Sequence, residues 1–377
     1  MADLSLTKHW PGLDGMRAVA VLAVVGYHLA LPHFDSGGFL GVDVFFVLSG
    51  FLITSLLIGE KMATGVVNMR DFAARRALRL LPALLAVILL AVAAVLTIRG
   101  VSFYRHDTLF DIPAVLFFVG NWLIPLSGHL NQLGLFTQTW SLSVEEQFYL
   151  IWPICLVATM GRFPRARIAF GLLLLVGLEW IVRLALVLSG ASYARIYYST
   201  FFHSDGLLLG ASLALLASER LLPSKFATSR RLPWLALGII IAMMLAGYGS
   251  LPYGWAIMTP ITVAATALVI ASVTSGSASP LSRSLSVKPL LWIGKRSYGI
   301  YLWHATILWI IAATPFYGSH VYLADVFVVA LTFGAAAASY ALIERPALRL
   351  KVRRFSRTES LPEALEEGSS GDVAPTH

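Results

Sequence analysis

Arg17 and His28 are the first pair of residues whose types and spacing could support chemistry. They stand near the start and at the end of the apolar segment LDGMRAVAVLAVVGYH, eleven residues apart. On a helix this spacing is a rotation of about 1100°, about 20° past three full turns, so both side chains share one face. A neutral imidazole there can take a proton from a hydroxyl or carry an acyl group. The alternative for His28 is an interfacial histidine among lipid headgroups.

Three further apolar segments carry histidines or carboxylates at one end. Asp43 stands in GGFLGVDVFFVLSGFLIT, Glu145 and Glu146 in WSLSVEEQFYLIWP, and His203 and Asp205 in FHSDGLLLGASLALL. A charge in hydrocarbon costs several kcal/mol unless it is paired or hydrated, so such residues are functional candidates. We expect them to lie with His28 at one membrane depth, the outer one, where Asp43 or Glu145 orients the imidazole. Ser141 or Ser143 could cap the helix with a glutamate in its first turn, but capping hardly accounts for two adjacent glutamates.

Arg76 and Arg79 form a second candidate constellation, which we expect at the inner end of its segment. The sequence FAARRALRLLPA places them three residues apart, on one face of a helix. Guanidinium groups on one face can bind phosphate groups bidentately. An arginine at the inner end of a span is also ordinary topology and headgroup contact, so the spacing leaves both roles open. His304, in IGKRSYGIYLWHA, either lines a passage or packs among aromatic neighbours.

The composition is that of a multi-span membrane protein. Of 377 residues, 58% are apolar and only 13% are charged, and the mean hydropathy is +0.76. A soluble protein carries about 25% charged residues. Cys155 is the single cysteine, which excludes an intrachain disulfide and a cysteine-based metal site, and we expect no metal. In a multi-span protein, a net charge of +8 is explained by basic residues in the cytoplasmic loops, so we expect no nucleic-acid partner.

The apolar runs predict an all-α integral membrane fold, with about ten transmembrane helices in a single bundle. Lys and Arg cluster in five loops, which the positive-inside rule places in the cytoplasm together with both termini. Counting residues 111–126, a short stretch broken by prolines, as a crossing would place the later basic loops outside, so we expect this stretch to be re-entrant or interfacial. Ser49 and the glycines near it are predicted close-packing positions. We expect residues 1–350 to form the transmembrane domain and the polar residues 351–377 a disordered cytoplasmic tail.

Six motifs, in order along the chain, strongly resemble the bacterial acyltransferase type three family. They are LDGMRAVAVLAVVGYH, GGFLGVDVFFVLSGFLIT, RRALRLLPA, WSLSVEEQFYLIWP, FHSDGLLLGASLALL and IGKRSYGIYLWHA, and they cover the chain from about Leu13 to Arg349. Members of this family are integral membrane O-acetylases of lipopolysaccharide O-antigen, peptidoglycan and other surface glycans. The resemblance implies function for the Arg and His of the first motif, use of acyl-CoA by the Arg-x-x-Arg element, and roles for two acids. In this sequence these residues are Arg17, His28, Arg76, Arg79, Glu145 and Asp43.

The resemblance implies a membrane-embedded O-acyltransferase in the cell inner (plasma) membrane. Acetyl-CoA would be the acyl donor, and the acceptor would be a surface glycan, a lipid-linked sugar or a small glycosylated metabolite. Acyl-CoA is cytoplasmic and surface glycans mature outside, so the acyl group would cross the membrane during transfer. Arg76 and Arg79 would hold the CoA phosphates, Arg17 would line the route, and His28 would be the base or the acyl carrier. Many relatives carry an extracytoplasmic hydrolase-like domain after the last span. We expect that here, where this sequence has no such segment after the last span, a separate partner protein performs any second step.

A proton-coupled membrane transporter is the alternative function, because such carriers also use intramembrane His, Asp and Glu. Against it, paired broken helices in corresponding halves of the chain are not evident in the sequence. A transporter also gives no reason for the pair Arg76 and Arg79. Consumption of acetyl-CoA with release of free CoA discriminates between the two functions.

Overall fold

The computed structural model describes residues 9–127, 133–223, 229–246, 254–275 and 279–349. All regular elements in these ranges are helices, which confirms the predicted all-α class. The ten longest are α1 (Pro11–His28), α2 (Gly41–Thr64), α3 (Met69–Thr97), α7 (Thr139–Met160), α8 (Arg165–Leu188), α10 (Asp205–Ser218), α12 (Leu232–Leu245), α13 (Gly254–Ser275), α16 (Ser297–Ala312) and α18 (Val321–Ser339). Each of them coincides with one of the ten apolar runs that the sequence analysis counts as spans.

Five of the described helices are long and apolar enough to cross a membrane: α2, α3, α8, α13 and α18. Three further apolar helices, α10, α12 and α16, are shorter, with 14 to 16 residues. The remaining two, α1 and α7, have 18 and 22 residues and carry ionisable side chains along their length. A membrane protein with several apolar helices is therefore established, whereas ten crossings and the cytoplasmic placement of both termini stay predictions.

The short elements lie between the long helices, except η6, which directly follows the last of them, α18. They are η1 (Gly38–Leu40), η2 (Arg99–Tyr104), α4 (Arg105–Phe110), α5 (Ile112–Leu116), α6 (Gly120–Ser127), η3 (Gly134–Phe136), α9 (Tyr193–Tyr197), η4 (Thr200–Phe202), α14 (Pro280–Leu285), α15 (Lys288–Lys295), α17 (Pro315–Ser319) and the π-turn η6 (Tyr340–Glu344). The segment 111–126 is thus folded as α5 and α6, of five and eight residues. Neither is long enough to span a bilayer, which needs about 20 residues.

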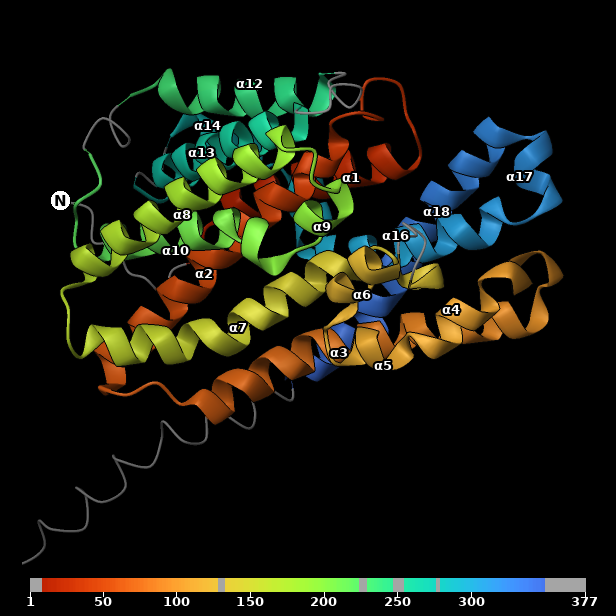
Figure 1. Ribbon diagram of the computed structural model, residues 1–377, viewed down its shortest axis with the longest axis horizontal. Helices are drawn as coiled ribbons and strands as arrows, with labels where there is room; N and C mark the ends of the chain where they lie inside the picture. The colour runs from red at the N-terminus through yellow and green to blue at the C-terminus, as the bar shows by residue number, and fades with distance from the viewer. Residues whose placement is uncertain (1–8, 128–132, 224–228, 247–253, 276–278, 350–377) are drawn as a thin grey trace, which may run out of the picture.

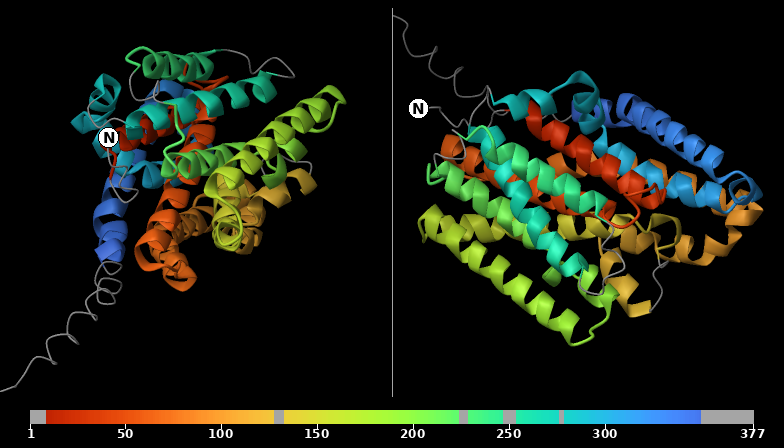
Figure 2. Two further views of the ribbon diagram at one scale, coloured as in Figure 1. Left: turned by 90° about the vertical axis from the view of Figure 1, so that its left-hand side faces the viewer. Right: turned by 90° about the horizontal axis from the view of Figure 1, so that it is seen from above.

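The long helices lie side by side along the longest axis of the molecule (Figures 1 and 2). The apolar stretch of α2 is 83% buried, whereas those of α8 and α18 are only 28% and 22% buried. Accordingly α2 is the central helix, and α8 and α18 lie at opposite edges in the view from above (Figure 2, right). Leu174 and Ile181 on α8 are 76% and 68% exposed. An apolar exterior of this extent is suited to lipid rather than water.

Glycines bring α10 against α2, as the small-residue pattern predicts. A Cβ atom on Gly210 would lie 2.2 Å from the carbonyl oxygen of Val47, and one on Gly50 would lie 2.0 Å from that of Leu207. Only glycine permits backbones to approach so closely. This contact fixes the start of α10, with His203 just before it, next to the start of α2.

Candidate active site

A cavity of about 60 Å³ lies between α1, α2, α7 and α16. Two of the predicted site residues line it, Arg17 from α1 and Glu145 from α7. Its other polar lining residues carry hydroxyl groups: Ser49, Ser141, Ser297, Tyr298 and Tyr301. The central cavity therefore combines a cation, a carboxylate and several hydroxyls within an apolar bundle.

Ser49 holds the carboxylate of Glu145 in the central cavity. Its Oγ donates a hydrogen bond of 2.8 Å to Glu145 Oε1. Across the cavity, Nε of Arg17 is buried and has no hydrogen-bond partner in the described part of the chain. Both Arg17 and Glu145 are half-buried. The guanidinium of Arg17 thus keeps hydrogen-bonding capacity that a ligand in the cavity could use.

A second hollow, the lateral groove, lies between α3 and α7 and has a volume of about 360 Å³. Arg76 and Glu146 line it, and their side chains form an ion pair of 2.8 Å. The guanidinium of Arg76 also lies 3.8 Å from the centre of the Tyr149 ring. Leu150, on the groove's wall, is 72% exposed, so the groove opens on the apolar exterior. Since consecutive residues diverge by about 100° on a helix, Glu145 and Glu146 face different hollows.

Arg79 lies near the charged groups of both hollows. It is half-buried, and within the residues described here it forms no hydrogen bond or ion pair. It interacts electrostatically with Arg17, Arg76 and Glu145. Three guanidiniums and the carboxylates of Glu145 and Glu146 give this region a formal charge of +1. The structure thus brings together three of the predicted cationic residues and one predicted acid.

The structure separates residues that the sequence analysis places at one depth. Glu145 contacts Ser49, which follows Asp43 by six residues on α2, a rise of about 9 Å. Glu146 pairs with Arg76, a residue predicted to lie at the opposite end of the membrane. The physical reason is the start of α7, which begins before the serines expected to cap it, so both glutamates stand in its second turn. Glu145 and Glu146 therefore lie near Arg17 and Arg76.

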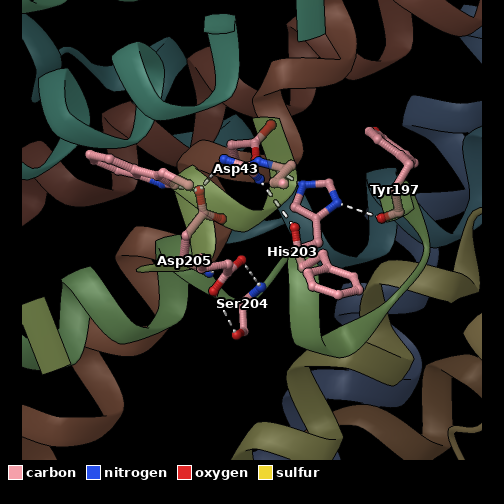
Figure 3. Close-up of polar contacts among 9 residues, drawn as sticks. Asp43, Tyr197, His203, Ser204 and Asp205 are labelled. Carbon is pink, nitrogen blue, oxygen red and sulfur yellow. Dashed lines mark hydrogen bonds and ion pairs between the residues drawn. The ribbon is translucent and has the colours of Figure 1, made fainter. Parts of the chain in front are cut away.

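Asp43 forms a fully buried pair with His203 rather than orienting His28. His203 Nε2 lies 2.9 Å from Asp43 Oδ1, and both side chains are inaccessible to solvent (Figure 3). His203 Nδ1 lies 2.6 Å from the carbonyl oxygen of Tyr197 and donates to it. The imidazole thereby joins α2 to the chain that enters α10. The expectation that Asp43 or Glu145 contacts His28 is not met by any described hydrogen bond.

The remaining acid of that level, Asp205, is also engaged within the protein. Its Oδ2 accepts hydrogen bonds from Arg183 Nη2 at 2.8 Å and from Trp180 Nε1 at 2.7 Å. Glu179 accepts from the backbone N–H groups of Ser204 and Asp205 at the start of α10 (Figure 3). These contacts of Asp205 and Glu179 join α8 to α10.

In the described ranges, no group of three or more His, Cys, Asp or Glu is placed to hold a metal ion.

His28, at the end of α1, contacts a second histidine. Its Nδ1 lies 2.9 Å from the carbonyl oxygen of Val24 and 3.3 Å from Nε2 of His304 on α16. His304 is buried and follows Tyr301, a residue of the central cavity wall, by one turn. The ring of His304 lies 5.5 Å from that of Tyr301, and neither histidine is among the residues that line the central cavity.

Sequence reasoning missed the polar groups that connect these residues. Ser49 was expected to be a packing position, but it is the hydrogen-bond donor to Glu145. Ser141 Oγ lies 2.6 Å from the hydroxyl of Tyr301, which links α7 to α16 across the cavity. The type and position of these hydroxyl residues are visible in the sequence, whereas their partners depend on how four helices are rotated.

Removing one member of the buried Asp43–His203 pair should destabilise the protein more than removing both. We expect Asp43→Leu and His203→Leu each to lower the free energy of unfolding by about 3–5 kcal/mol, because each leaves a buried polar group unpaired. The double variant should regain at least half of the summed loss. The measurement is unfolding of the purified proteins in detergent, with His106→Leu as a control at an exposed position. Additive losses would show that the two side chains are not coupled.

Comparison with known proteins places the chain in a family. The acyltransferase domain family matches residues 10–344. The chain is 38% identical over 369 residues to YrhL of Bacillus subtilis, covering 93% of this chain and 56% of that protein. It is 32% identical over 361 residues to the O-acetyltransferase OatA of Staphylococcus aureus, covering 93% of this chain and 59% of that protein.

A third relative is the peptidoglycan O-acetyltransferase OatA of Listeria monocytogenes, 33% identical over 355 residues, with 90% of this chain and 56% of that protein covered. The chain thus spans little more than half the length of these relatives. No solved structure matches it. The match over residues 10–344 and the identity to YrhL confirm the resemblance carried by the six motifs: the chain belongs to the acyltransferase type three family.

Proposed function

We propose that this protein is a membrane-embedded O-acyltransferase that moves an acetyl group from cytoplasmic acetyl-CoA to a hydroxyl of a surface glycan or lipid-linked sugar. The observation that carries the proposal is the cluster of Arg17, Arg76 and Arg79 beside a cavity lined by Glu145, with His28 at the end of the helix that carries Arg17. The names of two relatives, an O-acetyltransferase and a peptidoglycan O-acetyltransferase, favour acetyl as the group and a cell-wall glycan as the acceptor.

The arginines are suited to the phosphates of CoA. Guanidiniums bind phosphate oxygens through charge-assisted hydrogen bonds. Arg79 and Arg17 have no ion-pair partner within the described residues, whereas Arg76 is already paired with Glu146. We therefore assign the first contact with the donor to Arg79, with Arg76 joining when it leaves Glu146. Arg17, which lines the central cavity, would face the acyl group on its route.

His28 is the proposed base or acyl carrier. As a base, it takes the proton of the acceptor hydroxyl while the oxygen attacks the thioester carbonyl, and the proton ends on the departing CoA thiolate. As a carrier, its nitrogen first displaces CoA and then yields the acyl group to the hydroxyl. The net reaction is the same: an ester and CoA thiol form, and a thioester and a hydroxyl are consumed. No metal is required in either route.

Ten spans with both termini in the cytoplasm are part of the proposal. Ten long helices coincide with the predicted spans, and the intervening α5 and α6 are too short to cross. Residues 1–350 would form the acyltransferase domain in the plasma membrane, and residues 351–377 a cytoplasmic tail. The basic loops would then face the cytoplasm, where acetyl-CoA is made.

Loss of the imidazole at position 28 should abolish acyl transfer. Membranes with the wild type, supplied with acetyl-labelled CoA and a crude envelope fraction, should form an alkali-labile labelled product and release CoA. His28→Ala should lower both rates at least about 100-fold, the usual worth of a general base. His106→Ala, at an exposed position on α4, is the matched control and should be active.

Two results would contradict this assignment. Equal CoA release by the wild type and His28→Ala would exclude His28 from the chemistry. A well-folded wild type that transfers no label to any acceptor fraction would favour the transporter.

Arg79→Ala should weaken binding of the acyl donor and leave the rate of the chemical step almost unchanged. Since hydrogen bonds to charged groups contribute about 1.5–3 kcal/mol, the KM for acetyl-CoA should rise about tenfold or more with little change in kcat. Arg75→Ala is the control, because that arginine stands on the same helix in an ion pair with Glu60. Equal KM values for Arg79→Ala and the wild type would remove Arg79 from the donor site.

A further inference from the structure

Two backbone carbonyl oxygens fix which nitrogen of His28 and of His304 carries a proton. Nδ1 of His304 lies 2.6 Å from the carbonyl oxygen of Tyr301, and Nδ1 of His28 lies 2.9 Å from that of Val24. A carbonyl oxygen only accepts hydrogen bonds, so both Nδ1 atoms must carry hydrogen. A neutral His304 therefore presents the lone pair of its Nε2 to Nδ1 of His28, 3.3 Å away.

This arrangement places positive charge on one of the two rings only. A protonated His304 would direct its Nε2–H at the Nδ1–H of His28, donor against donor. A protonated His28 meets no such conflict, because its Nδ1–H points to two acceptors, the Val24 carbonyl and Nε2 of His304. The pair thus accommodates a cation at His28 while His304 stays neutral.

The reactive atom of His28 follows from the same contacts. With hydrogen on Nδ1, the lone pair of neutral His28 is on Nε2. This atom takes no hydrogen bond from any described residue, and the side chain is only half-buried. Nε2 is therefore the nitrogen available to a substrate.

We infer that His304 is a positioning residue for His28: it shares with the Val24 carbonyl the Nδ1–H of His28 and so reinforces the tautomer in which Nε2 is the reactive nitrogen. The inference rests on the proposed function and deepens it. When Nε2 takes the hydroxyl proton or bonds to the acyl carbon, the ring becomes a cation and its Nδ1–H becomes a stronger donor. His304 then stabilises that cation, as the aspartate of a Ser-His-Asp triad stabilises its imidazolium.

Two variants separate an acceptor at position 304 from mere packing. His304→Leu fills the site without an acceptor, whereas the amide oxygen of His304→Gln can still accept. We expect His304→Leu to lower kcat about tenfold with an unchanged KM for acetyl-CoA, and His304→Gln to stay within about threefold of the wild type. His304→Phe, an aromatic ring without an acceptor, replaces the leucine variant if that protein does not fold. Equal kcat for the apolar and glutamine variants would overturn the inference.

A second readout does not depend on acyl transfer. Diethyl pyrocarbonate acylates neutral imidazole, and its rate at His28 can be followed by mass spectrometry of the peptide that contains it. We expect labelling of His28 to be several-fold slower in His304→Leu than in the wild type and to be restored in His304→Gln. Equal labelling rates in all three proteins would overturn the inference. A wild type that transfers no acetyl group, together with slower labelling in His304→Leu, would refute the proposed function and leave the positioning role supported.

Discussion

The need to pair charges inside an apolar helical bundle governs the structure of this protein. An ionisable group in hydrocarbon is stable only when it is paired, hydrogen-bonded or in contact with water. Most of the charged side chains between the long helices meet this need inside the protein, in the pairs Arg75–Glu60, Arg76–Glu146, Arg183–Asp205 and His203–Asp43. Arg17, Arg79 and Nε2 of His28 form no hydrogen bond or ion pair with any described residue. The proposed reaction gives these three groups a substrate.

The paired groups build the frame that holds the unpaired ones. His203 and Asp43 join α2 to the start of α10, and Arg183, Glu179 and Asp205 join α8 to it. The side chains of both ion pairs at this level are inaccessible to solvent, and their contacts hold the three helices together. The adjacent level, with the glutamates of α7 and the arginines of α1 and α3, surrounds the central cavity and the lateral groove. Stability and chemistry thus occupy neighbouring levels of one bundle.

The sequence predicts the helical class, the position of each long helix and the residue types of the site, because hydropathy and charge act locally along the chain. It does not predict which acid meets which base. The capping pattern around Ser141 and Ser143 places the start of α7 too late, and this shift moves Glu145 to the wrong level. The contact between His28 and His304 joins residues on helices far apart in sequence, so no spacing rule indicates it. Helix rotation in the folded bundle decides these partners.

A sided reconstitution tests whether the acyl group crosses the membrane during transfer. Proteoliposomes of uniform orientation would contain a glycan acceptor in the lumen, with acetyl-labelled CoA supplied only at the face that carries the basic loops. The account predicts an alkali-labile acetyl ester on the enclosed glycan, formed while the vesicles stay impermeable to CoA. Acetylation only of acceptors on the same side as acetyl-CoA would contradict it, because the acyl group would then never cross the bundle.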